Sequence, residues 1–546
     1  MKKSFLRILL LSMVGLTVCY FILRSQLISI SPYFVVFSVL LVIAEFYTVV
    51  HFLNALYSFW PHKYEVYKKV NYNKHITLNV LICVCGEPVE LVRTTILAAK
   101  KTSEVYSNKI NPITSPRVVV LNDGYAAKKD NWREIQQLCK ELGVRHILRK
   151  TTKGYKAGNI NNGLKNLPAK RPHNTIDIVF DADFAALPKF LIEITKPFVN
   201  DRIDFIQTPQ RYRNEKTWVA KAAGSHQINF FQYYCAAKAH DNALFLCGTN
   251  FAIRRSALND VGGMDTRFIT EDYSTALNLH LAGKKGAYIK EPLAVGVAPS
   301  TLKAYFKQQQ RWAKGTFDVS FAYLPKILFG PLTIKQKMHY LVASTYYLIG
   351  VRDFILVLGP LPFLFFNVPL VQTSSHNLLL YFYVPLVIFN FITSILLVRE
   401  PVKSLVLNLI TFPIFFSAFV SSIFRKKLGF IVTIKKYEQE NIFIIYRTQI
   451  IICLLLLTGL SVNIEVYGAH GATAAINYFW TIYDILCLSI GLFLMIKENH
   501  VSKLDEFGYS KLRYKNGTKR TIQRYFSIRP KLTTIAKRLG VILPGV

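Results

Sequence analysis

The amino-acid sequence predicts an α/β domain that is inserted into an α-helical membrane bundle. The chain has 546 residues, of which 51% are hydrophobic and 18% are charged, and this mixture excludes a disordered or collagen-like chain. Apolar runs as long as a membrane-spanning helix, which takes about 20 residues, flank a polar stretch at residues 76–325. In that stretch, strand-like segments alternate with helix-like segments, which is typical of a parallel α/β sheet.

Six apolar segments are expected to span the bilayer as helices, two before the polar stretch and four after it. They are residues 4–24, 33–58, 338–367, 378–399, 443–462 and 475–496. A further apolar run at residues 403–424 contains Pro413 and lies between two basic ends. We expect this run to lie along the cytoplasmic surface of the membrane.

The distribution of basic residues predicts which side of the membrane each part occupies. The chain has 67 Lys and Arg against 32 Asp and Glu, a formal net charge of +35. The outer connections, at 25–32, 368–377 and 463–474, contain no Lys or Arg, whereas residues 497–546 contain twelve, with three acidic residues. Because basic residues collect on the cytoplasmic side, both termini and the polar stretch are expected in the cytoplasm of a multi-pass plasma-membrane protein. Topology and anionic lipid account for the charge, and no nucleic-acid-binding motif is present.

Five ionisable residues fall inside the expected spans, where charge is costly in lipid. They are Glu45, Arg352, Asp353, Arg447 and Asp484. One interpretation is pairing between helices without any role in transport. The other interpretation is a polar path through the bundle.

Four buried strands are predicted in the polar stretch, at residues 78–85, 117–123, 145–150 and 176–184. The first is almost entirely apolar, as a buried parallel strand should be. Helices are expected after Pro88 and at residues 131–143. Ligands of parallel α/β sheets bind outside the carboxyl ends of the strands. The acidic residues that fall there are Glu87, Asp123, Asp181 and Asp183.

The motif Asp181-Ala182-Asp183 ends the fourth predicted strand. Two carboxylates that flank one small residue could hold a divalent cation such as Mg²⁺, which binds carboxylates together with substrate phosphates. The alternative is a pair of solvated acids in a turn.

The motif Thr270-Glu271-Asp272 follows the turn-forming residues 262–265 and precedes a predicted helix. Asp272 is expected near the N-terminus of that helix, where a carboxylate is stabilised as an anion. The alternative is an ordinary acid in the first turn of a helix.

The motif at residues 308–312 carries an amide, a cation and an aromatic ring on one helix face, because Gln308, Arg311 and Trp312 have i, i+3 and i+4 spacing. The planar fork of Arg suits a phosphate, and Trp offers a flat surface to a sugar ring. The alternative is an interfacial Trp on an amphipathic helix, because residues 301–325 run just ahead of an expected span.

The order of these elements resembles that of the processive family 2 glycosyltransferases, and among them the catalytic subunits of bacterial cellulose synthases. The elements are Glu87, Asp123, Lys156-Ala157-Gly158-Asn159, Asp181-Ala182-Asp183, Thr270-Glu271-Asp272 and Gln308-Gln309-Gln310-Arg311-Trp312. The resemblance covers about residues 76–500. Three further segments are similar to parts of that group: residues 207–210 to its VQTP segment, 245–249 to its acceptor-site segment and 430–435 to its gating loop.

The sequence departs from that pattern at several positions. Asn122-Asp123-Gly124 keeps only the second acid of the usual pair, and Cys85-Gly86-Glu87 lacks an aromatic residue that could stack on uracil. Lys436 stands where a glycine is usual, and the tail is too short for the cyclic-di-GMP-binding domain of many bacterial cellulose synthases. These departures bear on the polymer and its regulation more than on the reaction class.

The resemblance implies a Rossmann-like fold of the GT-A type that binds a UDP-sugar. Asp123 would contact the uridine, and Lys156 would contact a phosphate. Asp181 and Asp183 would address the nucleotide and Mg²⁺ (or Mn²⁺) respectively, and both count as candidate metal ligands. Arg311 would help to neutralise the departing diphosphate.

The resemblance also implies how the acceptor is held. Asp272 would be the general base for the acceptor hydroxyl, with Glu271 beside it in the catalytic set, and Trp312 would stack under the acceptor end. The remaining expected substrate-binding residues are Glu87, Gln308, Cys247, Gly248, Thr249, Phe430 and Thr433.

The implied function is the polymerisation of a UDP-sugar, UDP-glucose above all, into a β-linked polysaccharide such as cellulose, which leaves through the transmembrane helices. The expected parts are two helices in 1–58, the catalytic domain at 76–325, two helices in 338–399, an interfacial helix and gating loop at 403–440, two helices in 443–496 and a basic cytoplasmic tail at 497–546. The expected partners are the donor, the growing polysaccharide, the bilayer and accessory secretion subunits. Three alternatives stay open: a non-processive enzyme with a lipid acceptor, a synthase of a β-1,3- or mixed-linkage glucan, and a non-catalytic transporter or scaffold.

Overall fold

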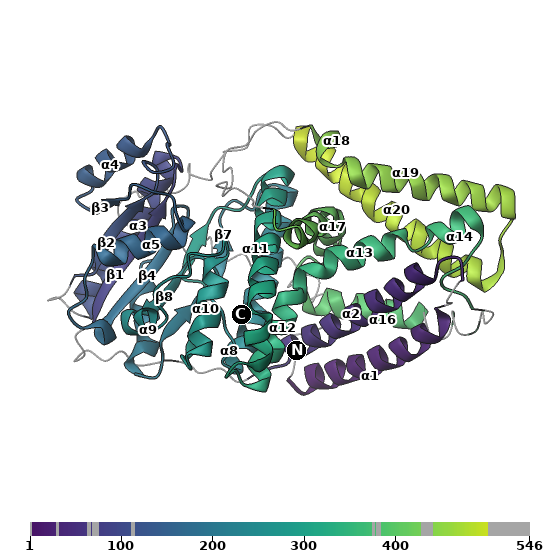
Figure 1. Cartoon of the computed structure of the whole chain (residues 1–546), viewed down its shortest axis with the longest axis horizontal. Helices are drawn as coiled ribbons and strands as arrows, with labels where there is room; N and C mark the ends of the chain where they lie inside the picture. The colour runs from purple at the N-terminus through teal and green to yellow at the C-terminus, as the bar shows by residue number, and fades with distance from the viewer. Residues whose placement is uncertain are drawn as a thin grey trace, which may run out of the picture.

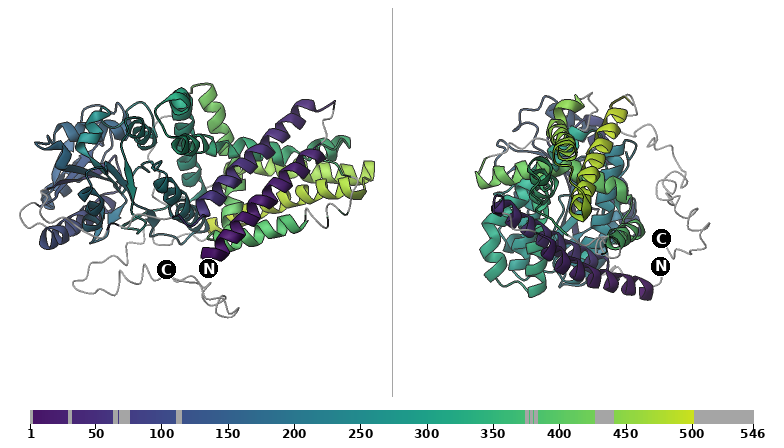
Figure 2. Two further views of the ribbon diagram at one scale, coloured as in Figure 1. Left: turned by 90° about the horizontal axis from the view of Figure 1, so that it is seen from below. Right: turned by 90° about the vertical axis from the view of Figure 1, so that its right-hand side faces the viewer.

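The structure is a computed structural model that describes residues 3–28, 32–62, 67, 76–110, 115–373, 377, 380, 384–426 and 441–500. An α/β domain and a bundle of long helices lie end to end (Figures 1 and 2). The N-terminal helices α1 (Lys3–Leu27) and α2 (Val35–Phe59) lie in the bundle, where α2 packs against a helix from the second half of the chain. The chain therefore leaves the bundle to form the α/β domain and then returns to it.

The core of the α/β domain is a seven-stranded sheet of order β3-β2-β1-β4-β8-β6-β9. Its strands are β1 (Thr77–Val84), β2 (Arg117–Asn122), β3 (Arg145–Leu148), β4 (Thr175–Asp181), β6 (Phe205–Gln207), β8 (Phe251–Arg254) and β9 (Gly286–Tyr288). The four strands expected from the sequence are all present as β1 to β4 and pair in parallel. A smaller sheet of order β5-β10-β7 is formed by β5 (Ala185–Ala186), β10 (Ala294–Gly296) and β7 (Gln210–Tyr212).

The expectation of a wholly parallel sheet is wrong at one strand. β8 runs antiparallel to both of its neighbours, β4 and β6, whereas β6 and β9 are parallel. The three added strands have only three or four residues each. Such short segments lack the hydrophobic pattern from which a strand and its direction could be inferred.

Helices cover both faces of the large sheet. One face carries α3 (Val89–Lys109), α4 (Trp132–Glu141) and α6 (Phe190–Thr195), and the other carries α5 (Tyr155–Lys165), α9 (Arg255–Asp260) and α10 (Glu271–Leu281). Successive residues of a strand point to opposite faces. Ile82 of β1 therefore enters the first core, whereas Leu81 and Cys83 enter the second. Both cores bury the helices' apolar sides and hold the strand ends in fixed positions.

The helix α11 (Leu302–Phe329) stands between the sheet and the bundle (Figure 1). It begins after Thr301, whose hydroxyl accepts a hydrogen bond from the Ala304 amide at 3.2 Å, a standard N-cap. Ala313 and Phe317 of α11 pack against Phe415 and Ala418 of α17 (Pro401–Ile423). The connection from β7 to β8 runs through α7 (Trp218–Asn229), a π-helical segment (Phe230–Tyr234) and α8 (Cys235–His240).

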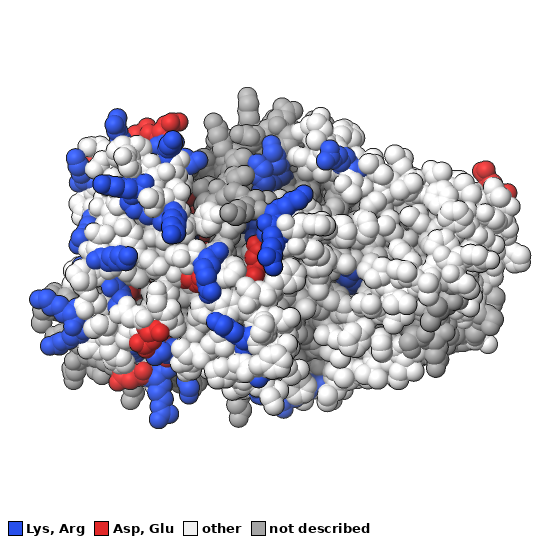
Figure 3. Space-filling model, viewed as in Figure 1, with Lys and Arg blue, Asp and Glu red and all other residues white. Residues whose placement is uncertain are grey.

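Six helical segments in the described part of the chain are long and apolar enough to cross a membrane. They are Ser4–Ile22, Val35–Phe59, Ile334–Phe366, Pro401–Ile423, Arg447–Tyr467 and Gly471–Lys497. The helices after α11 are α12 (Ile334–Thr345), α13 (Ile349–Leu358), α14 (Leu361–Phe366), α16 (Val384–Leu397), α17, α18 (Ile442–Ile445), α19 (Arg447–Val462) and α20 (Gly471–His500). Charged side chains gather over the α/β domain, and the visible surface of the bundle is almost free of them (Figure 3). This surface is that of a membrane protein.

Two segments differ from the expected pattern of spans. The described helix within residues 378–399, α16, has 14 residues, whereas α17 has 23. Figure 1 nevertheless shows α17 nearly end-on while α13, α19 and α20 run in the plane of the view. The surface position expected for residues 403–424, and the domain limits that depend on it, stay predictions.

Three of the five ionisable residues expected inside the spans, Glu45, Arg352 and Asp353, have polar partners in the bundle. The hydroxyl of Tyr20 on α1 donates to Glu45 on α2 at 3.2 Å. Arg352 pairs with the adjacent Asp353, with 2.8 Å between Nε and Oδ1. The first contact joins two helices, as the pairing interpretation expects, whereas the second lies within α13. A polar path through the bundle stays a prediction.

Candidate active site

The acidic residues expected at the sheet edge do lie there. Asp181 is the last residue of β4, and Asp123 directly follows β2, where its amide donates to the Val84 carbonyl at 2.8 Å. Because β1 lies between β2 and β4, Glu87 after β1 falls between them. The three parallel strands therefore deliver carboxylates to one edge.

Asp123 is held by a residue that the sequence did not single out, Arg149, which directly follows β3. The guanidinium donates a hydrogen bond to each carboxylate oxygen, from Nε to Oδ1 and from Nη2 to Oδ2, the second at 2.6 Å. Both side chains are nearly buried. Burial raises the pKa of Asp123, and Arg149 opposes that shift. Arg149 also donates to the carbonyls of Lys153 (2.7 Å) and Tyr155 (2.5 Å), so it fixes the turn that begins α5.

Lys156 in the first turn of α5 reaches the motif at the end of β4. Its ammonium pairs with Asp181 and donates to the Gly248 carbonyl at 2.5 Å. Burial by itself lowers the pKa of Lys156, but Asp181 and neighbouring acids outweigh burial and raise it. The lysine therefore stays charged at the site and links α5, β4 and the segment around residue 248.

The two acids of the motif at residues 181–183 have different surroundings. Asp183 is 6% exposed, whereas the side chain of Asp181 is 39% exposed. The interpretation as solvated turn acids is therefore wrong for Asp183. Glu87 lies close to both, and burial, with the charges of Asp183 and Asp181, raises its pKa to about 7. Glu87 also accepts a hydrogen bond from the Cys85 amide at 2.6 Å.

Glu271 and Asp272 form the first turn of α10, as expected, and both face the site. Burial raises the pKa of both carboxyl groups, the charge of Asp272 raises that of Glu271 further, and the positive charge of Lys156 lowers both. Asp272 accepts a hydrogen bond from the Tyr273 amide at 2.8 Å. A Cβ on Gly248, whose φ is +80°, would lie 3.3 Å from the other carboxylate oxygen of Asp272. The backbone at residue 248 therefore passes beside this carboxylate.

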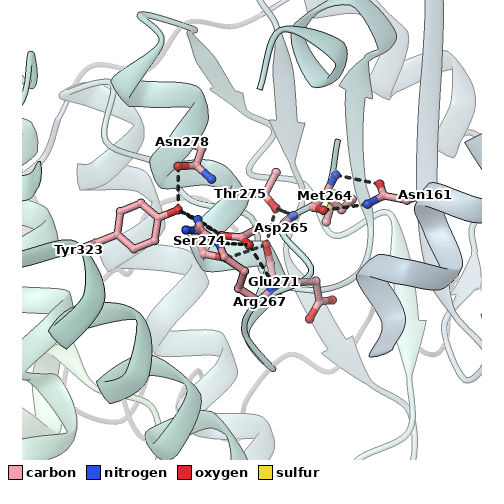
Figure 4. A network of polar contacts seen from close by, with 9 residues as sticks. All are labelled: Asn161, Met264, Asp265, Arg267, Glu271, Ser274, Thr275, Asn278 and Tyr323. Atoms are coloured by element: carbon pink, nitrogen blue, oxygen red, sulfur yellow. Dashed lines mark hydrogen bonds and ion pairs between the residues drawn. The ribbon is translucent and has the colours of Figure 1, made fainter. Parts of the chain in front are cut away.

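A polar network behind the site fixes this first turn of α10 (Figure 4). Asp265 accepts hydrogen bonds from the Arg267 side chain at 2.9 Å and from the Tyr323 hydroxyl at 3.1 Å. The Asp265 amide donates to the Thr275 hydroxyl at 2.9 Å, and that hydroxyl donates to the Glu271 carbonyl at 2.5 Å. The loop before α10 is thus tied to both α10 and α11. No sequence pattern pointed to Thr275 and Tyr323 as partners of Asp265, from which they lie ten and 58 residues away.

The motif at residues 308–312 lies on α11, close to the motifs at residues 181–183 and 270–272. A Cβ on Gly315 would lie 2.6 Å from Thr270, so only a glycine lets α11 approach the turn before Glu271 so closely. Gln308 is buried, and Arg311 and Trp312 are half-buried. Burial lowers the pKa of Arg311, and four acids oppose that shift. These acids are Asp181, Glu271, Asp272 and Asp183.

The segment at 245–249 is held by the residues at 207–210, and both were expected only from the resemblance. The Gln207 side chain accepts from the Cys247 amide at 2.8 Å and donates to the Thr249 carbonyl at 2.9 Å. Gln210 donates to the Cys247 carbonyl at 2.5 Å. The Thr249 hydroxyl accepts from the Asp181 amide at 2.9 Å. The two segments and the end of β4 therefore form one hydrogen-bonded unit.

The site can supply hard oxygen ligands to a divalent cation. The described part of the chain has no cluster of three or more His, Cys, Asp or Glu side chains with metal-ligand geometry. Mg²⁺, however, is commonly held by one or two carboxylates together with substrate phosphates. Asp183 and Asp181 meet that requirement. Phe430 and Thr433 of the expected gating loop lie outside the described residues.

Comparison with known proteins agrees with this geometry. A model of glycosyl transferase family 2 matches residues 79–262, and a model of glycosyl transferase family group 2 matches residues 178–421. The cellulose synthase catalytic subunit [UDP-forming] of Pseudomonas fluorescens is 28% identical over 462 residues, which are 81% of this chain and 59% of that protein. The cellulose synthase 1 catalytic subunit of Komagataeibacter xylinus is 29% identical over 307 residues, 55% of this chain and 38% of that protein. The chain thus spans at most about three fifths of the length of these relatives.

Among solved structures, a mannosyltransferase from Pyrobaculum calidifontis in complex with GDP-Man and Mn²⁺ aligns with a TM-score of 0.49 and 15% identity. The alignment covers 71% of this chain and all of that one. The family models together run from residue 79 to residue 421, across the mixed sheet and all three motifs. Across the mixed sheet and all three motifs the chain is therefore similar to family 2 glycosyltransferases, with flanking helices that are long and apolar enough to cross a membrane, and its sequence is similar to those of cellulose synthase catalytic subunits.

Proposed function

We propose that the chain is a processive, inverting glycosyltransferase that polymerises a UDP-sugar, UDP-glucose above all, into a β-linked polysaccharide such as cellulose. The polymer would leave the cell through the transmembrane helices, and the catalytic domain would face the cytoplasm. One observation carries the proposal: the backbone at Gly248 passes beside Asp272, at an edge of the sheet that also holds Lys156 and Arg311. The relatives named cellulose synthase support the choice of product.

The donor would lie along the carboxyl ends of β1, β2 and β4. Asp123, oriented by Arg149, would receive the uridine. Lys156 and Arg311 bring two half-buried positive charges to the acidic edge, where they would stabilise negative charge on the departing diphosphate. Asp183 and Asp181 would hold Mg²⁺ or Mn²⁺, which when bound supplies further positive charge to that diphosphate.

The acceptor would lie between the segment at 245–249 and Asp272. As the acceptor oxygen attacks the anomeric carbon, the bond from that carbon to the diphosphate oxygen breaks. The hydroxyl proton passes to Asp272, whose raised pKa suits a base that works near neutral pH. A single displacement inverts the anomeric centre, so an α-linked donor gives a β-linkage.

The test is the purified protein in vesicles with a panel of UDP-sugars and Mg²⁺, followed by measurement of UDP release and linkage analysis of the product. We expect a β-linked polymer from one donor, with UDP-glucose as the strongest substrate. A product that carries a single added sugar on a lipid would establish the non-processive alternative. A β-1,3- or mixed-linkage polymer would change the product but keep the mechanism. No UDP release from any donor would contradict the proposal.

A further inference from the structure

Asp241 directly follows α8 and lies where the catalytic domain meets two helices of the bundle. Its side chain is only 2% exposed. Three donors reach its carboxylate: the Tyr57 hydroxyl at 2.5 Å, Lys335 Nζ at 2.8 Å and His339 Nε2 at 2.9 Å. Tyr57 belongs to α2, and Lys335 and His339 belong to α12. One buried carboxylate of the catalytic domain thus joins two helices that are far apart in the sequence.

A buried carboxylate without partners would be strongly unfavourable, so the three donors stabilise this arrangement. Burial raises the pKa of Asp241, but Lys335, Tyr57 and His339 outweigh it and lower the pKa to about 2. The group is therefore charged throughout the physiological range. Replacing the charge would weaken the junction without removing a large side chain.

Two neighbouring residues strengthen the same junction. The Asn242 carbonyl accepts a hydrogen bond from Gln336 of α12 at 2.7 Å. Lys238 of α8 lies 3.3 Å from the His339 carbonyl, and its ammonium is 5.1 Å from the centre of the Phe245 ring. The start of the connection after α8 is therefore fixed to α12 by side-chain contacts on both sides of Asp241.

Asp241 and the active-site edge are joined by one short stretch of chain, residues 241–249, which we call the acceptor loop. Its far end is held at the active site, where the Thr249 hydroxyl accepts from the Asp181 amide. In its middle, the Phe245 ring lies edge-on to Tyr273, 5.2 Å between centroids, and Tyr273 directly follows Asp272. The loop thus has one end on the membrane helices and the other beside Asp272.

We propose that Asp241 is a positioning residue, which fixes the acceptor loop relative to α2 and α12 so that the acceptor end is presented correctly to Asp272. The inference rests on the proposed function, because it assigns residues 245–249 to the acceptor side. Beyond that function, it states that the carboxylate of Asp241 and its three donors align the catalytic domain with the membrane helices.

The test compares three full-length variants in vesicles. Asp241→Asn keeps the shape and removes the charge, and Tyr57→Phe removes one donor and keeps the ring. The control is Tyr47→Phe on the same helix, because the Tyr47 hydroxyl donates to the carbonyls of Thr345 and Tyr346 but not to the catalytic domain. Hydrogen–deuterium exchange of the acceptor loop gives a readout that does not require activity.

In Asp241→Asn and Tyr57→Phe we expect faster exchange in the acceptor loop and unchanged exchange in β1. UDP affinity and KM for the donor should stay at the wild-type value, while kcat for transfer falls by about tenfold or more, because a misplacement of about 1 Å can cost 10²-fold. Tyr47→Phe should match the wild type in all of these. If Asp241→Asn does not fold, Tyr57→Phe decides the question.

Unchanged exchange in the acceptor loop, or a loss of UDP affinity that equals the loss of kcat, would overturn the inference. The two proposals fail in different ways. If the wild type is inactive but hydrogen–deuterium exchange in the acceptor loop still becomes faster in Asp241→Asn and Tyr57→Phe, the proposed function is contradicted and the structural role of Asp241 stands. If the wild type is active but exchange in the acceptor loop is the same in all variants, only the role of Asp241 is contradicted.

Discussion

The Gly248 backbone and the Asp272 carboxylate are so close that a β-carbon on residue 248 would lie 3.3 Å from an oxygen of Asp272. Gly248 also has a φ of +80°, a conformation that residues with a side chain rarely adopt. This contact places the end of the segment at 245–249 directly against the proposed base.

Gly248→Ala should strain the backbone and crowd Asp272 at the same time. We expect transfer to fall by at least tenfold while UDP binding, measured by calorimetry, changes little. Gly262→Ala is the matched control, because Gly262 has the same φ of +80° and nothing within 4 Å of an added Cβ. If both variants lose equal activity, backbone strain alone explains the effect and the contact with Asp272 is unimportant.

Asp272→Asn should remove the base and keep the donor site. General-base catalysis contributes about 10²–10⁴-fold, so we expect a loss of turnover in that range with nearly normal UDP affinity. Both quantities should be measured on the same preparation. Turnover close to that of the wild type would exclude Asp272 as the base.

The rate should depend on pH through the raised pKa of the pair Glu271 and Asp272. The base acts only when it is ionised, so lowering the pH through the raised pKa protonates it and slows transfer. The acid limb of kcat should therefore lie well above pH 4, about the ordinary value for an Asp. In this pair the charge of Asp272 raises the pKa of Glu271 above that of Asp272. Glu271 is therefore still neutral when Asp272 titrates, and Glu271→Gln should leave the acid limb in place. A limb that moves to lower pH in Glu271→Gln would contradict this order of titration.

Asp183→Ala should abolish the part of UDP binding that depends on Mg²⁺, because the diphosphate then lacks its bridging cation. Calorimetry of UDP with and without Mg²⁺ measures it, and the exposed residue Lys128, replaced by Ala, serves as a control. Identical Mg²⁺ dependence in wild type and Asp183→Ala would show that the buried acid is structural.

The sequence predicted the parts of the fold that have strong local patterns. The strands β1 and β4 are buried on both faces of the sheet, and their apolar composition therefore indicated parallel strands. Because the carboxyl ends of parallel strands meet at one edge, the acids that follow these strands were expected there. The direction of β8 depends on pairing with distant strands, and its four residues carry no sign of it.

Residues that act through distant partners were not predicted. Arg149 donates hydrogen bonds to Asp123, which lies 26 residues earlier at the end of the neighbouring strand. Asp241 meets Tyr57 from 184 residues away. In the sequence, Arg149 and Asp241 are isolated charged residues that belong to no recognisable motif. Only the fold shows that burial and a specific partner give it a role.

The most direct test of the account is a pulse–chase experiment on the wild-type protein in vesicles. A pulse of radiolabelled UDP-glucose with Mg²⁺ is followed by excess unlabelled donor and a short acceptor, and the length and anomeric configuration of the labelled product are measured. A processive inverting enzyme should extend the chains that it already holds, so the label should end in long β-linked polymer. Labelled products of one or two sugars on the added acceptor or on lipid, or α-linked products, would contradict it.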